Sequence, residues 1–146
     1  MTPAVLVATM GGVGRLRPGP GTWGSAVVLP MAWAGPVPCL VGAAVLAVAG
    51  FWAAGRLDCS KDPGWFVVDE GAGMLLALAA LPGPGLPGLV LAFLLFRVFD
   101  IAKPWPVSWA DRQEGPAGVM LDDLLAGVIA AAILLAVQAA LPGSLG

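Results

Sequence analysis

The sequence contains no histidine, and this absence excludes several kinds of active site. Catalysis of the Ser-His-Asp or Cys-His type needs an imidazole, and so does a zinc site built on histidine ligands. Any chemistry must therefore use carboxylates, lysine, arginine, hydroxyl groups and the backbone.

Charged residues are also scarce, at 11% of the 146 residues, whereas a typical soluble domain has about 25%. Hydrophobic residues make up 59% of the chain, and the mean hydropathy is +0.91. So little charge cannot cover the surface of a soluble protein, and the composition predicts an integral membrane protein. The length fits a single domain, residues 1–146. The net charge of −2 argues against a nucleic-acid partner.

All sixteen charged residues fall into three clusters, which are Arg15 with Arg17, Arg56 to Glu70, and Arg97 to Asp123. Pro and Gly interrupt the first two of the uncharged stretches, at Gly35–Pro38 and at Pro82–Gly88, and predict turns there. We therefore expect an all-α, polytopic membrane helical bundle with about four to five membrane-embedded helices. Two hairpins would be followed by a final span, residues 124–141.

This arrangement brings all three charged clusters to one membrane face. Lysine and arginine favour the cytoplasmic side, so the polar loops should converge on the cytoplasmic face. The arms at 71–81 and 89–96 are too short to cross a bilayer. They are either re-entrant or extend into the charged segments.

Two pairs of acids stand directly before apolar stretches: Asp69 with Glu70, and Asp122 with Asp123. Acids in a first helical turn offset the helix dipole, which is a purely structural explanation for each pair. Two such pairs at one membrane face favour a different explanation, because carboxylates near hydrocarbon are costly without a cation. Mg²⁺, which prefers oxygen ligands and substrate phosphates, is the cation that fits best.

Three further features suit a phosphate group. The irregular loop Arg15–Ser25 has free backbone N–H groups and places the hydroxyls of Thr22 and Ser25 where an apolar helix begins. A Pro-Gly loop with Thr22 as an N-cap is the structural alternative. Arg97 and Asp100 would share a helix face, and Lys103 stands just before Pro104, which disfavours helical geometry there. Arginine and lysine beside carboxylates could bind phosphate oxygens together with a metal.

Four blocks, in this order, carry a resemblance: PGTWGS, VDEGAGM, FRVFDIAKPWPVSWADR and GVMLDDLLAG. Together they span Pro20 to Gly127, and their order resembles the phosphatidylglycerophosphatase A family. The resemblance implies a Mg²⁺-dependent phosphatase of the bacterial inner membrane, multi-pass, with its active site facing the cytoplasm. Such enzymes convert phosphatidylglycerophosphate to phosphatidylglycerol and inorganic phosphate in phospholipid biosynthesis.

The resemblance also implies roles for residues of this chain. Carried over by position, the metal ligands would be Asp69, Glu70, Asp100, Asp122 and Asp123, and all of these except Asp122 are catalytic candidates. The phosphate-binding candidates would be Thr22, Gly24, Ser25, Arg97 and Lys103. Two departures are Gly71-Ala72, a packing change, and Pro116, which stands where the family tends to have glycine.

Two alternatives belong to other functional classes. A small transporter or channel subunit could coordinate a cation with the same carboxylates, but it predicts acids distributed along a pore. A CDP-alcohol transferase also uses Asp and Mg²⁺, but its Asp-Gly…Ala-Arg…Asp…Asp pattern is not present. The sequence leaves open whether water or an Asp attacks the phosphate, how many metals bind, and the oligomeric state.

Overall fold

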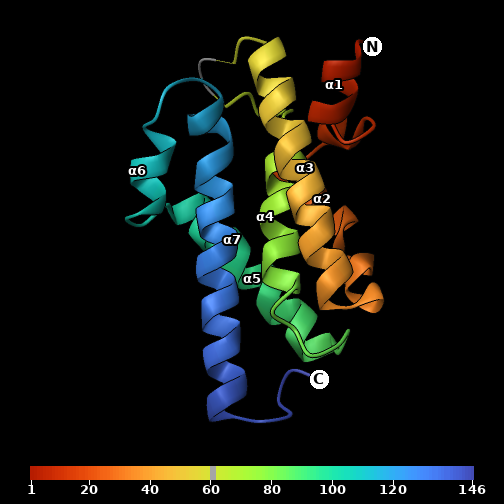
Figure 1. The fold of residues 1–146 in the computed structure, drawn as a ribbon, viewed down its shortest axis with the longest axis vertical. Coiled ribbons are helices and arrows are strands. Elements are labelled where there is room, and N and C mark those ends of the chain that lie inside the picture. Colours follow the sequence, from red (N-terminus) through yellow and green to blue (C-terminus); the bar gives the residue numbers. More distant parts are fainter. Residues whose placement is uncertain (60–61) are drawn as a thin grey trace.

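The computed structural model describes residues 1–59 and 62–146, and within these ranges the secondary structure is entirely helical (Figure 1). The all-α prediction is confirmed for this part of the chain. The helices are α1 (Pro3–Ala8), η1 (Val13–Arg15), α2 (Pro20–Val27), η2 (Leu29–Ala34), α3 (Pro36–Arg56), α4 (Val68–Leu78), α5 (Leu86–Ala102), α6 (Val107–Asp111) and α7 (Gly115–Ala140).

Both expected turns are present. Gly35 separates η2 from α3 with a φ of 98°, a backbone conformation that favours glycine, and Pro36 occupies the first turn of α3. The Pro-Gly segment between α4 and α5 ends where α5 begins at Leu86. Helix α5 continues past Phe96 to Ala102, so this arm extends into the charged segment. It stops at Lys103, which caps the helix in the left-handed conformation with a φ of 47° and is followed by Pro104.

Within residues 1–59 and 62–146, two helices are long and apolar enough to cross a membrane. Helix α3 has 21 residues and α7 has 26, with hydropathy values of 2.1 and 2.2. Helix α5, at 17 residues, and α4, at 11, have lengths of roughly 25 and 16 Å, below the ~30 Å of a hydrocarbon core. The expectation of four to five embedded helices therefore remains a prediction.

The sequence-based prediction of where the last helix begins was wrong. Helix α7 begins at Gly115, with Pro116 in its first turn, and not at Leu124. Proline is favoured at this position because its missing N–H would have no partner within the helix. Asp122 and Asp123 consequently lie two turns inside α7, whose first turn contains no acid. Compensation of the helix dipole cannot explain this pair, although it still applies to Asp69 and Glu70 in the first turn of α4.

Helix α4 is the most buried element and lies between α3 and α7 (Figure 1). It crosses α7 at two glycines. A Cβ atom on Gly127 would overlap the carbonyl group of Gly73, and one on Gly73 would overlap the carbonyl group of Asp123. This close approach brings the acids of α4 and α7 together, because Glu70 and Asp123 stand about one helical turn from Gly73 and Gly127.

Candidate metal and phosphate site

Three carboxylates from two helices converge at the α4–α7 crossing. Asp69 and Glu70 of α4 and Asp123 of α7 each offer one oxygen, and these oxygens lie within 4.8 Å of one another. Asp69 is 0% exposed and Asp123 is 3% exposed. The structure thus brings one member of the second acidic pair together with both members of the first.

Several oxygens of this region lack hydrogen-bond donors. Among the described residues, no donor reaches Asp69 Oδ2, Glu70 Oε2 or Asp122 Oδ1, all of which are buried. A buried carboxylate without a partner is costly, and a bound cation removes that cost. Hard carboxylate oxygens from three side chains form a donor set that suits Mg²⁺ or Ca²⁺. These residues therefore fit a divalent metal.

The remaining two predicted carboxylates are each paired with a cation. Arg97 Nη1 donates to Asp100 Oδ2, three residues further along α5. Lys103 Nζ lies 2.5 Å from Asp122 Oδ2 and 3.3 Å from Asp111 Oδ1.

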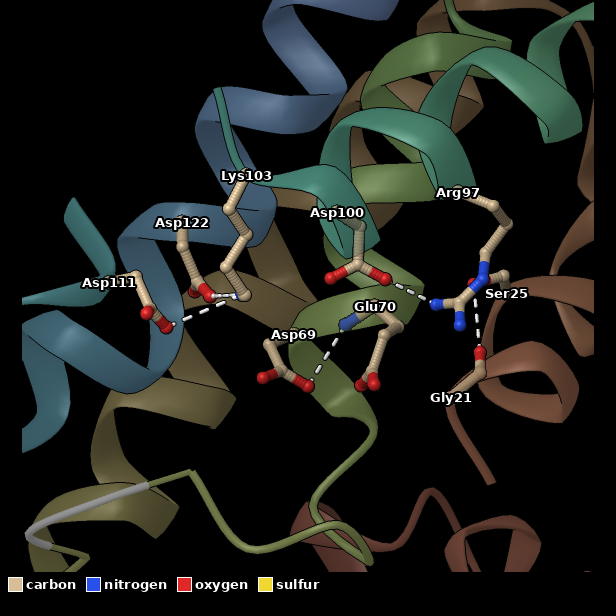
Figure 2. A network of polar contacts seen from close by, with 9 residues as sticks. All are labelled: Gly21, Ser25, Asp69, Glu70, Arg97, Asp100, Lys103, Asp111 and Asp122. Atoms are coloured by element: carbon tan, nitrogen blue, oxygen red, sulfur yellow. Dashed lines mark hydrogen bonds and ion pairs between the residues drawn. The ribbon is translucent and has the colours of Figure 1, made fainter. Parts of the chain in front are cut away.

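Figure 2 shows the two cations on opposite sides of the carboxylates, with Asp69, Glu70 and Asp100 between them. Burial alone would lower the pKa of Lys103, but its hydrogen bond to Asp122 and the charges of Asp122, Asp123 and Asp111 raise it above its ordinary value. Lys103 is consequently a permanent cation at neutral pH. A phosphate between Arg97 and Lys103 would meet positive charge from both sides.

The α2 segment reaches the site through a residue that the sequence did not single out. A Cβ atom on Gly21 would lie 2.5 Å from Glu70 Oε1 and 3.2 Å from Arg97 Nη1, so this backbone lines the site directly. Ser25 is fully buried, and its hydroxyl donates to the Gly21 carbonyl at 2.9 Å (Figure 2). Gly24 packs against Val67, to which a Cβ would come within 2.8 Å.

Thr22 does not cap α2. The N-cap is Gly19, Pro20 follows it, and no side chain makes a capping hydrogen bond. The side chain of Thr22 is exposed. Of the three α2 candidates, Ser25 is therefore hydrogen-bonded to the site's backbone, Gly24 fills a packing position, and Thr22 points to the outside.

Two acidic side chains near the site were missed. Asp111 pairs with Lys103 across the α5–α6 connection, and its sequence signals were its place in the third charged cluster and in the block FRVFDIAKPWPVSWADR. Asp62, in the loop before α4, retains contact with solvent, yet surrounding protein raises its pKa to about 8. The charges of Glu70, Asp122 and Asp100 add to this shift and Lys103 opposes it. Lys61, beside it, lies outside the described residues.

Known proteins are similar to this chain over most of its length. Residues 6–138 match the family model described as Phosphatidylglycerophosphatase A. A Haemophilus influenzae protein of that name is 33% identical over 147 residues, covering 94% of this chain and 90% of the relative. An Escherichia coli protein of the same name is 46% identical over 74 residues, covering 50% of this chain and 43% of the relative. No solved structure matches the chain.

Proposed function

The chain belongs to the phosphatidylglycerophosphatase A family, a family of phosphatases, and we propose that it removes the terminal phosphate of phosphatidylglycerophosphate in a Mg²⁺-dependent reaction. The products are phosphatidylglycerol and inorganic phosphate. The observation that carries this proposal is the buried cluster of Asp69, Glu70 and Asp123 between Arg97 and Lys103. Clustered acids suit a metal, and the flanking cations suit a phosphate.

The proposed setting is the bacterial inner membrane, crossed more than once, with the site on the cytoplasmic side. Helices α3 and α7 support it by their length and hydropathy. Trp105, which precedes α6, is 80% exposed and Trp109, within α6, is 52% exposed, as expected for tryptophans at a membrane interface. Helices α4 and α5 would be embedded between the two long helices without each crossing the bilayer.

The chain's own residues would share the work as follows. Asp69, Glu70 and Asp123 would hold the metal, and Asp100 and Asp122 would orient Arg97 and Lys103. When bound, the metal supplies positive charge that neutralises the phosphate and favours attack on phosphorus. Arg97 and Lys103 would stabilise the phosphate oxygens as charge develops on them.

Two routes of attack remain open. In one, a carboxylate takes a proton from water, the water oxygen bonds to phosphorus, and the bond to the glycerol oxygen breaks as that oxygen takes up a proton to become the alcohol of the product. In the other, an Asp oxygen attacks and forms an acyl-phosphate, which water then hydrolyses. Acid quenching followed by borohydride reduction would distinguish them, because an acyl-phosphate on an Asp is reduced to an alcohol and forms only by the second route.

The transport alternative receives less support from this geometry. A conducting pathway predicts acids spread along the bundle axis. Asp69, Glu70 and Asp123 instead lie within 4.8 Å of one another, at a single level of the α4–α7 crossing.

A direct assay tests the proposal. Purified protein in detergent should release phosphate from phosphatidylglycerophosphate when Mg²⁺ is present, and the release should fall to background with a chelator. The chelated sample should recover its activity when Mg²⁺ is returned, because the helices α3, α4 and α7 pack through apolar contacts that do not involve the acids. Absence of Mg²⁺-dependent release from protein with an intact helical circular dichroism spectrum would refute the enzyme assignment.

A further inference from the structure

An apolar groove of about 300 Å³ lies between α2 and α5. Ala26 of α2 and Leu29 of η2 form one wall, and residues of α5 from Leu86 to Leu94 form the other. The outer side is open, since Leu86 is 72% exposed and Leu94 is 54% exposed. Every lining side chain is hydrophobic, so a polar occupant would gain nothing here.

One end of this groove is the candidate phosphate site. Ala26 directly follows Ser25, whose hydroxyl bonds the Gly21 carbonyl. On the other wall, Phe93 precedes Arg97 by four residues, one turn of α5, and so lies on the same helix face. Figure 2 shows Gly21, Ser25 and Arg97 close to one another in the charged site. The apolar groove and the charged site are thus consecutive along the same two helices.

Size alone does not single out this groove. A larger apolar hollow of about 640 Å³ lies along α3, lined by residues between Ala44 and Trp52. All of its lining residues come from α3, and the cation at its end is Arg56, which lies over the Trp52 ring at 5.8 Å. In the part of the chain that the structure describes, the clustered carboxylates Asp69, Glu70 and Asp123 are not among the residues that line this hollow. Continuity with Arg97 and Glu70 distinguishes the α2–α5 groove.

We propose that the α2–α5 groove holds an acyl chain of the phospholipid whose terminal phosphate binds between Arg97 and Lys103. This inference rests on the proposed phosphatase function and adds to it a determinant of substrate class. In a membrane the acyl chain only exchanges contacts with other lipids for contacts with the groove. The groove therefore acts mainly by aligning the lipid with the site. The enzyme should therefore prefer acylated substrates to the free head group.

Filling the groove tests this preference. Ala26→Phe occupies it, and Ala49→Phe makes the same change in the α3 hollow, where the alanine is likewise half-buried. The substrates are dioleoyl phosphatidylglycerophosphate and its deacylated head group in the same detergent. We expect Ala26→Phe to lower kcat/KM for the lipid about tenfold and the lipid-to-head-group ratio at least about fivefold. Ala49→Phe should change neither value by more than about twofold.

Because Ala26 directly follows Ser25, Ala26→Phe could disturb the phosphate site itself, and a second pair of variants avoids this. Val90 lies seven residues before Arg97 and is 49% exposed, and Val45 in the α3 hollow is 60% exposed. Val90→Trp should reproduce the loss of lipid preference and Val45→Trp should not. If Val90→Trp keeps the wild-type ratio while the wild type hydrolyses the lipid, the groove assignment is wrong and the phosphatase assignment stands.

Photolabelling detects a lipid bound in the groove without requiring its hydrolysis. A phosphatidic acid with a diazirine in one acyl chain should label α5 between Leu89 and Phe93, and both the dioleoyl lipid and Val90→Trp should abolish that label. This labelling result supports the groove assignment even if the wild type hydrolyses neither substrate. Lack of hydrolysis would reject the proposed phosphatase function and leave the groove assignment standing. Labelling spread equally over α3 and α5 would overturn the groove assignment.

Discussion

Replacing Asp123 with asparagine is expected to lower Mg²⁺-dependent phosphate release by about three orders of magnitude in a protein that stays folded. Asp123 is 3% exposed and supplies one of three oxygens that lie within 4.8 Å of one another. Asparagine keeps the size of the side chain but removes the charge that would hold the cation. The measurement is kcat/KM with phosphatidylglycerophosphate at saturating Mg²⁺.

The control for this variant is Asp111→Asn. That side chain is 43% exposed and lies 3.3 Å from Lys103, so its loss should change kcat/KM by no more than about threefold. Thermal unfolding in chelator separates the roles further. Without metal, Asp123→Asn should be at least as stable as the wild type, because it removes a buried negative charge from a cluster of acids. Near-normal turnover together with a lower Tm would assign Asp123 a structural role in α7.

Replacing Arg97 with alanine is expected to lower kcat/KM about a hundredfold, the second largest effect. The guanidinium lies beside the Gly21 backbone and pairs with Asp100, with only 16% of its side chain exposed. Its removal takes away positive charge from the phosphate and leaves Asp100 as a further unpaired acid. Arg112→Ala is the matched control, because Arg112 is exposed after α6 and should change kcat/KM by no more than about twofold.

A double variant separates the two consequences of losing Arg97. Arg97→Ala with Asp100→Asn removes both members of the ion pair, so the thermal stability lost in the single variant should return. Activity should stay low, because the phosphate still lacks its cation. Recovery of activity along with stability would mean that Arg97 only neutralises Asp100.

Turns were predictable from the sequence because proline and glycine act locally. Gly35 and the segment between α4 and α5 fall where their backbone preferences place them. The beginning of α7 was not predictable from charge patterning, since the uncharged stretch that marked the final span starts only at Leu124, whereas the helix begins at Gly115. Its Asp pair is tolerated inside a helix because α4 and Lys103 lie against it, a tertiary effect.

The residue types of the site could be predicted from the sequence, but which of those residues lie close together could be predicted less well. Asp69, Glu70 and Asp123 form the three-acid cluster, whereas Asp122 lies outside it and pairs with Lys103, nineteen residues away in sequence. Gly21 could not be recognised from sequence, because its role is a close backbone approach and not a functional group. Thr22, with a hydroxyl, was the more conspicuous residue and lies exposed.

The location of bound manganese would test the metal site most directly. Mn²⁺ prefers the same oxygen ligands as Mg²⁺ and gives an anomalous diffraction signal. In crystals grown with Mn²⁺ we expect an anomalous peak bounded by Asp69, Glu70 and Asp123, and no such peak in Asp123→Asn. An active wild-type protein whose only anomalous peak lies away from these three carboxylates would contradict the metal site.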